Sequence, residues 1–117
     1  MYELLVALGI LTFIFFLLAS TNALTAYSKH SAVLWIASKH KIFGMLASIT
    51  AITHMIIAII NDSFRLTGLL TVIALVLTGL FGMLFYKLKK KSLYIAHRVM
   101  GPITLVLIII HVVTNLI

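Results

Sequence analysis

Four histidines stand in two copies of one sequence pattern. The segments HKIFGMLASITAITH, residues 40–54, and HRVMGPITLVLIIIH, residues 97–111, both read His, a basic residue, two others, Gly, nine more and His. The matched positions are His40, Lys41, Gly44 and His54 in the first copy and His97, Arg98, Gly101 and His111 in the second. Imidazole binds transition metals and also carries protons near neutral pH. The repeat therefore predicts a set of metal ligands or a proton-carrying path, and the structural alternative is a set of buried histidines that hydrogen-bond across a helix bundle.

The spacing places both histidines of a copy on one face of a helix. Fourteen residues are about 3.9 turns, so the two rings lie within about 40° of each other and about 21 Å apart along the axis. Two such helices, parallel and side by side, would align His40 with His97 and His54 with His111. The sequence thus predicts two sites, each with an imidazole from either helix.

The elements that position these histidines are apolar enough to cross a bilayer. The chain has 117 residues, of which 63% are hydrophobic and 9% charged, a composition unlike that of a soluble domain. Four stretches reach the roughly 20 residues that a membrane helix needs. We expect one all-α domain over residues 1–117, an integral membrane four-helix bundle with up-down-up-down topology. The expected helices run from about 3–27, 40–61, 65–87 and 93–117.

Eight of the nine lysines and arginines of this chain, whose formal net charge is +7, gather in two connections, and the ninth is Arg65. They are Lys29, Lys39 and Lys41 in the first, and Lys87, Lys89, Lys90, Lys91 and Arg98 in the second. By the positive-inside rule both connections face the cytoplasm and both termini lie outside, as expected in a prokaryotic plasma membrane. This placement favours topology control and contact with anionic lipid, or docking of an acidic redox partner. It argues against nucleic-acid binding.

The first basic connection also contains an apolar run. Residues 33–36, Val-Leu-Trp-Ile, lie among lysines, which is typical of a segment at the membrane interface anchored by its tryptophan. We expect His30, which lacks a histidine fourteen residues away, to be solvated there.

Small residues repeat at the same interval as the histidines. Gly68 and Gly82 are fourteen residues apart in the third expected helix, and Gly9 and Ala23 are fourteen apart in the first. Glycine destabilises a helix, so this register suggests that a bulky group fits against the backbone. Close packing of small residues between membrane helices is the equally weighted alternative.

The residue types narrow the chemistry of the histidines. The chain has no cysteine, which excludes disulfides, iron–sulfur clusters and thiolate ligands. Each level offers two imidazoles without a carboxylate, whereas zinc usually takes four ligands. Haem iron takes four ligands from the porphyrin and needs only two axial ones from protein. With both axial positions filled, the chemistry would be electron transfer.

On these residues the chain resembles the di-haem four-helix core of b-type cytochromes, as in the cytochrome b of quinol–cytochrome c oxidoreductases. It is also similar to the transmembrane domain of ferric reductases and NADPH oxidases. The shared signal is two H-[KR]-x2-G-x9-H motifs within four apolar helices. The resemblance implies two b-type haems between the second and fourth helices, an inner one on His40 and His97 and an outer one on His54 and His111.

The resemblance also implies roles for other residues. The glycines expected to contact the haems are Gly9, Gly44, Gly68, Gly82 and Gly101, and Ala23 stands where a further glycine would be. Lys41 and Arg98 would pair with the propionates of the inner haem and Arg65 with those of the outer one. The second ring nitrogen of each ligand should donate to a nearby oxygen. For His54 the candidates are the Thr50 hydroxyl or a backbone carbonyl near it.

The expected function is transmembrane electron transfer from an inner donor to an outer acceptor. The chain has no G-x-G-x-x-G motif and no segment for a flavin or nicotinamide domain, so the donor should be a quinol or a flavoprotein. Three alternatives remain: a stand-alone reductase of ferric iron, superoxide or quinone; a histidine-lined haem or metal transporter; and an engineered minimal haem scaffold. The sequence is compatible with a homodimer and with one subunit of a larger complex.

Overall fold

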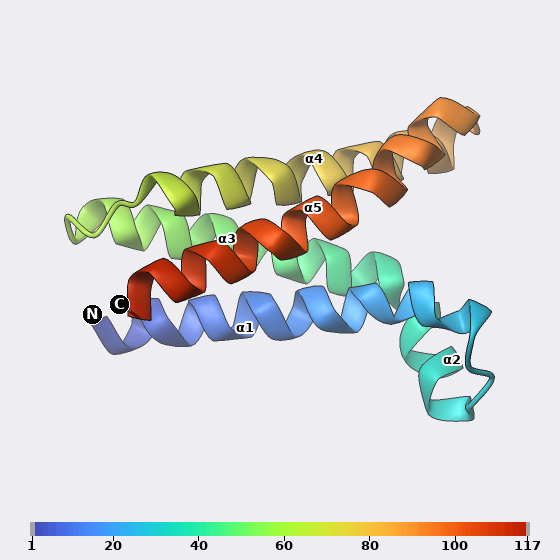
Figure 1. The fold of residues 1–117 in the computed structure, drawn as a ribbon, viewed down its shortest axis with the longest axis horizontal. Coiled ribbons are helices and arrows are strands. Elements are labelled where there is room, and N and C mark those ends of the chain that lie inside the picture. The colour runs from blue at the N-terminus through green and yellow to red at the C-terminus, as the bar shows by residue number, and fades with distance from the viewer. Residues whose placement is uncertain (1, 117) are drawn as a thin grey trace. The chain divides into compact units, whose positions relative to one another are not determined.

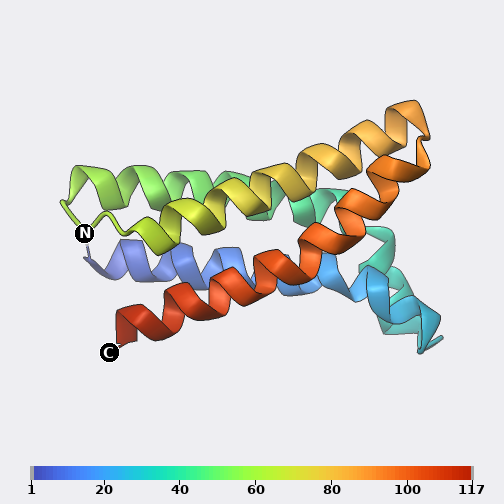
Figure 2. The same ribbon diagram turned by 45° about the horizontal axis from the view of Figure 1, so that its top comes forward.

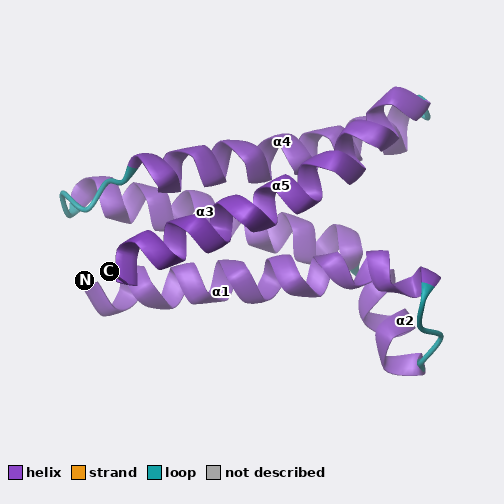
Figure 3. Cartoon of the chain, in the orientation of Figure 1, coloured by secondary structure: helices purple, strands orange, loops and turns teal. Residues whose placement is uncertain are grey.

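The computed structural model describes residues 2–116, which form helices joined by short connections (Figure 1). In chain order these are α1 Tyr2–Ser20, the 3₁₀ helix η1 Thr21–Ala26, α2 Ser31–Ser38, α3 His40–Ile60, α4 Leu66–Leu88 and α5 Lys91–Leu116. Within this range every segment is helix or loop (Figure 3), which confirms the predicted all-α class. The chain divides into two compact units, one up to Ile57 and one from Ala58 onward.

Four helices are long and apolar enough to cross a membrane. Their bounds are Tyr2–Ala26, His40–Ile60, Leu66–Leu88 and Lys91–Leu116. These bounds agree with the predicted segments to within two residues, except at the predicted end of the last segment, residue 117, which lies outside the described residues. Large apolar side chains such as Ile14, Ile49 and Ile73 remain exposed on these helices. An apolar exterior of this kind suits the hydrocarbon of a bilayer, where the helix satisfies its own backbone groups.

In the first unit α1 and α3 pack antiparallel. Ring nitrogens near the two ends of α3 reach α1 carbonyls in reversed order, His40 to Ala19 and His54 to Leu5. Between these ends the Thr12 hydroxyl donates to the Thr50 hydroxyl at 2.9 Å. Such hydroxyl pairs are a common polar contact between membrane helices.

The first predicted helix, 3–27, is not one continuous α-helix. After Ser20 the chain winds as the 3₁₀ helix η1, where hydroxyls bond nearby carbonyls. Thr21 Oγ1 donates to Leu18 O, and Thr25 Oγ1 donates to Asn22 O. These local bonds compete with regular helix formation.

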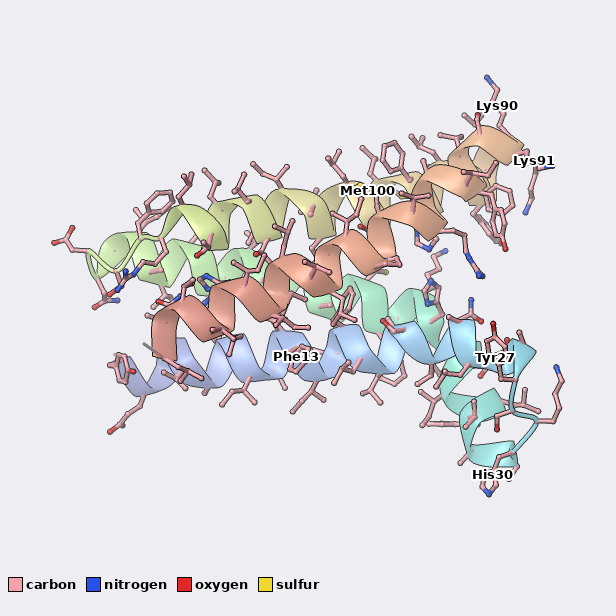
Figure 4. All side chains as sticks on the ribbon, viewed as in Figure 1. Phe13, Tyr27, His30, Lys90, Lys91 and Met100 are labelled. Atoms are coloured by element: carbon pink, nitrogen blue, oxygen red, sulfur yellow. The ribbon has the colours of Figure 1, made fainter. Side chains whose placement is uncertain are left out.

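The connection after η1 forms a further helix, α2, which the sequence analysis did not assign. It begins after His30, whose Nδ1 accepts a bond from the Ala32 N–H at 3.1 Å and so caps the helix. His30 is exposed, as predicted, and lies at the end of α2 (Figure 4). Trp35 on α2 is also exposed, and Lys39 Nζ lies 6.0 Å from the centre of its ring.

In the second unit α4 and α5 form an antiparallel hairpin (Figure 2). The turn between them is made by Lys89, which has a left-handed backbone with φ 58° and donates its N–H to Phe85 O at 2.8 Å. The packed face is polar as well as apolar, because the Thr78 and Thr104 hydroxyls lie 3.0 Å apart. Thr104 is fully buried.

Candidate functional site

Three of the four repeat histidines bond a backbone carbonyl of the helix packed beside them. The bonds run from His40 Nδ1 to Ala19 O at 2.7 Å, from His54 Nδ1 to Leu5 O at 2.8 Å and from His97 Nδ1 to Thr78 O at 2.7 Å. A carbonyl only accepts, so Nδ1 must carry the proton in each ring. In a neutral imidazole this leaves the lone pair on Nε2, the tautomer found in metal-ligating histidines.

The imidazoles lie on glycines. A Cβ added at Gly9 would be 3.1 Å from His54 Cε1, one at Gly68 would be 3.0 Å from His111 Cε1, and one at Gly82 would be 2.9 Å from His97 Cε1. All three distances are shorter than ordinary van der Waals contact, which begins at 3.4 Å. Each of these glycines therefore leaves the space that the facing ring occupies.

The carbonyl acceptor and the glycine are linked by helix geometry. Leu5 stands four residues before Gly9, and Thr78 stands four residues before Gly82. In an α-helix the carbonyl of residue i points toward residue i+4, so a ring bonded to that carbonyl must lie over residue i+4. The repeated small residues thus have a structural reason, because the bulky group that fits against the backbone here is the imidazole. Contact of these glycines with haem stays a prediction.

Ala23 occupies the equivalent position in sequence, but the chain is not α-helical there. It stands four residues after Ala19, the acceptor for His40, but it lies in η1 and is exposed. A 3₁₀ helix has about 3.0 residues per turn, so the face shared by Gly9 and Ala23 in a regular α-helix is not maintained. The His40 end of the α1–α3 pair therefore differs from its counterpart at His97.

His111 is bonded by side chains. Thr67 Oγ1 lies 2.9 Å from its Nδ1 and Asn115 Nδ2 lies 3.3 Å from the same atom. Residue Phe64, four positions before Gly68, precedes the start of α4 at Leu66, so its carbonyl does not belong to the helix. The Thr67 hydroxyl, in the first turn of α4, takes that place.

The motif glycines of the two histidine helices have a different environment. An added Cβ at Gly44 or Gly101 meets no atom of residues 2–116 within 4 Å beyond its own surroundings in the helix. Neither glycine is needed to make room for a described side chain. A cofactor contact at these two positions stays a prediction.

The three cations expected to pair with propionates lie at the surface, and the Thr50 hydroxyl bonds its own helix. Lys41, Arg98 and Arg65 are all exposed, and the Arg98 guanidinium lies 5.8 Å from the centre of the Tyr94 ring. Pairing of these cations with propionates stays a prediction. Thr50 donates to Leu46 O at 2.9 Å in its own helix, while the acceptor for His54 is Leu5 O on α1.

The side chains of residues 2–116 limit which kind of metal group the protein could bind. No group of three or more His, Cys, Asp or Glu side chains gathers there in a way that could hold a metal ion. A bare ion such as zinc takes at least three protein ligands, whereas a bis-histidine haem takes two. No protein-family model, curated protein or solved structure matches the chain.

Proposed function

We propose that this protein is a di-haem b-type membrane cytochrome that transfers electrons across the bilayer. The observation that carries the proposal is the H-[KR]-x2-G-x9-H motif, which occurs once in α3 and once in α5. Both helices are apolar and long enough to span a membrane. A histidine repeated for packing alone would not need the same fourteen-residue interval twice. Ionisable side chains within membrane segments are usually functional.

The donor set fits haem. Each iron would take one imidazole from each motif, with His40 and His97 at the inner level and His54 and His111 at the outer level. The Nδ1 bonds to carbonyls fix the tautomer and orientation of three of these rings, which is how ligating histidines are usually held. Haem bound in this way supplies reversible one-electron exchange, without an open coordination position.

The side chains between the histidines would keep water away from haems bound there in a bilayer. Apart from the basic residue that follows the first histidine, Lys41 or Arg98, the side chains between the histidines of each motif are apolar or carry hydroxyls. These hydroxyls bond helix carbonyls or one another, as Thr104 bonds Met100 O and the Thr78 hydroxyl. Among residues 2–116 no buried side-chain nitrogen or oxygen lacks a hydrogen-bond partner. Such a lining presents few groups that would need to reorient when charge moves.

The partners follow from the charges. By the positive-inside rule the basic connections favour a cytoplasmic position for the inner level. There a quinol or a flavoprotein would be the donor, and Lys41 and Arg98 would meet the propionates. Arg65, just before α4, would do so at the outer level. An acceptor on the outer side would then be a redox protein or a quinone.

The test is a haem count on the detergent-purified chain, with a reduced-minus-oxidised spectrum. We expect two b-type haems per chain, low-spin in both redox states. Replacing His54 or His111 with Ala should remove the same haem, and replacing His40 or His97 should remove the other. His30→Ala is the matched control and should keep both. Absence of haem after expression with ample haem supply would refute the proposal.

A further inference from the structure

The four histidines differ in what holds Nδ1. His40, His54 and His97 donate to backbone carbonyls at 2.7–2.8 Å. At His111 the groups beside Nδ1 belong to Thr67 and Asn115. In the described bonds the two expected ligand pairs are therefore unequal, because both rings of the inner pair bond a carbonyl, whereas in the outer pair one ring bonds a carbonyl and the other has side-chain partners.

The orientation of Asn115 is set by a second bond. Its Nδ2 donates to His111 O at 2.7 Å, and a carbonyl can only accept, so this atom is the amide nitrogen. The same nitrogen lies 3.3 Å from His111 Nδ1. The amide therefore presents hydrogens, with partial positive charge, toward the ring.

The Thr67 hydroxyl must act as the acceptor when His111 ligates iron through Nε2. In that state Nδ1 carries the proton, which the amide nitrogen of Asn115 cannot accept, while Thr67 Oγ1 at 2.9 Å can. A hydroxyl oxygen is a weaker hydrogen-bond acceptor than a peptide carbonyl oxygen, whose basicity is raised by resonance with the amide nitrogen. His111 is thus held by a weaker acceptor than the other three rings and beside an amide donor.

The strength of this bond affects the iron. An imidazole that donates to a strong acceptor becomes more electron-rich and binds the ferric state better. Hydrogen bonds around the axial ligands are among the main means by which a protein sets haem potential. A weaker acceptor at His111 should therefore favour the ferrous state of the outer haem.

We propose that Thr67 and Asn115 are positioning residues that raise the reduction potential of the outer haem above that of the inner haem. This inference rests on the proposed function. With haem bound on these residues, such a difference in potential would favour transfer of one electron from the inner haem to the outer haem, with no atom or proton exchanged. The inner quinol or flavoprotein supplies that electron and the outer acceptor removes it.

The test compares two substitutions with opposite expected effects. Thr67→Val keeps the shape but removes the acceptor, so the potential of the outer haem should rise. Asn115→Asp places a carboxylate acceptor near Nδ1, so the potential should fall. We expect each shift to be about tenfold in the oxidation equilibrium, which is about 59 mV for a one-electron couple. The control is Thr53→Val. Thr53 is next to His54 in sequence, and in the described bonds its hydroxyl donates only to the carbonyl of Ile49 in its own helix.

The measurement is a spectroelectrochemical titration of the full chain, with the outer haem identified by repeating it in a His40→Ala background. Shifts of opposite sign confined to the outer haem support the inference, since a purely structural role would lower haem content in both variants. Two haems with equal potentials, or unchanged potentials in both variants, would overturn the inference and leave the proposed function standing. A chain without haem would overturn the proposed function itself.

Discussion

Alanine at Gly82 is expected to remove the haem that His97 is proposed to ligate, while leaving the other in place. An added Cβ would lie 2.9 Å from both Cε1 and Nδ1 of His97, whereas ordinary contact begins at 3.4 Å. The ring must therefore move by about 0.5 Å, the difference between these distances. Because Nδ1 is bonded to Thr78 O at 2.7 Å, such a move stretches that bond to about 3.2 Å, the upper limit of good geometry.

The effect on haem affinity should exceed the effect on folding. Weakening one hydrogen bond loses about 0.5–1.5 kcal/mol, and replacing a helical glycine with alanine gains about 1 kcal/mol, so the free energy of unfolding should change little. Metal sites, in contrast, tolerate ligand displacements of only about 0.2 Å. Changes in the groups that orient a ligand typically lower metal affinity about 10–100-fold, which is about 1.4–2.8 kcal/mol.

The matched variant is Gly68→Ala. Its Cβ would lie 3.0 Å from His111 Cε1, so the same substitution at the other end of α4 should affect the other haem. The assay is a haem count per chain with a redox titration, and circular dichroism checks that the helices persist. Each variant should hold about one haem at wild-type potential under limiting haem supply. Two haems with unchanged potentials in both variants would refute the assignment of the glycine-facing rings as ligands.

Two further predictions concern packing and membrane contact. Thr104→Val should lower the free energy of unfolding by about 1 kcal/mol, because Thr104 is 0% exposed and bonds the Thr78 hydroxyl. Unfolding in mixed micelles measures this free energy. The control is Thr114→Val at an exposed position, which should leave it unchanged. Trp35, 62% exposed on α2, should have its fluorescence quenched more by lipids brominated near the headgroup than near the bilayer centre. Equal quenching by both lipids would contradict an interfacial position for α2.

Helix positions were predictable where the length of an apolar run decides them. The segment predicted at 40–61 is α3 at His40–Ile60, because charged or turn-forming residues bound the run at both ends. The segment predicted at 3–27 is helical to Ala26, but its last turns form the 3₁₀ helix η1 and not an α-helix. Hydroxyl bonds to nearby carbonyls decide that change, and composition does not reveal them. The helix α2 was missed because its cap is His30, a residue outside the usual capping set.

The candidate ligands were predictable from spacing, but the groups that hold them were not. Every residue has a carbonyl, so nothing in the sequence marks Leu5 or Thr78 as an acceptor. The glycine four residues later is the signal that could have found them, once a ring is known to lie on it. Thr67 and Asn115 had weaker signals: one precedes Gly68 and the other stands four residues after His111, where it shares a helix face with that ring.

Equal intervals on the two helices of a hairpin are a geometric requirement. In the α4–α5 pair the order reverses, so that Gly82 meets His97 and Gly68 meets His111. Both contacts form together only if the glycine interval equals the histidine interval, because one extra residue turns a helix by about 100°. The α1–α3 pair retains this match at Gly9 and loses the α-helical register beyond Ser20. The departures, at His40 and at His111, fall in different expected haem pairs, so each pair keeps one imidazole with both the carbonyl bond and the glycine contact.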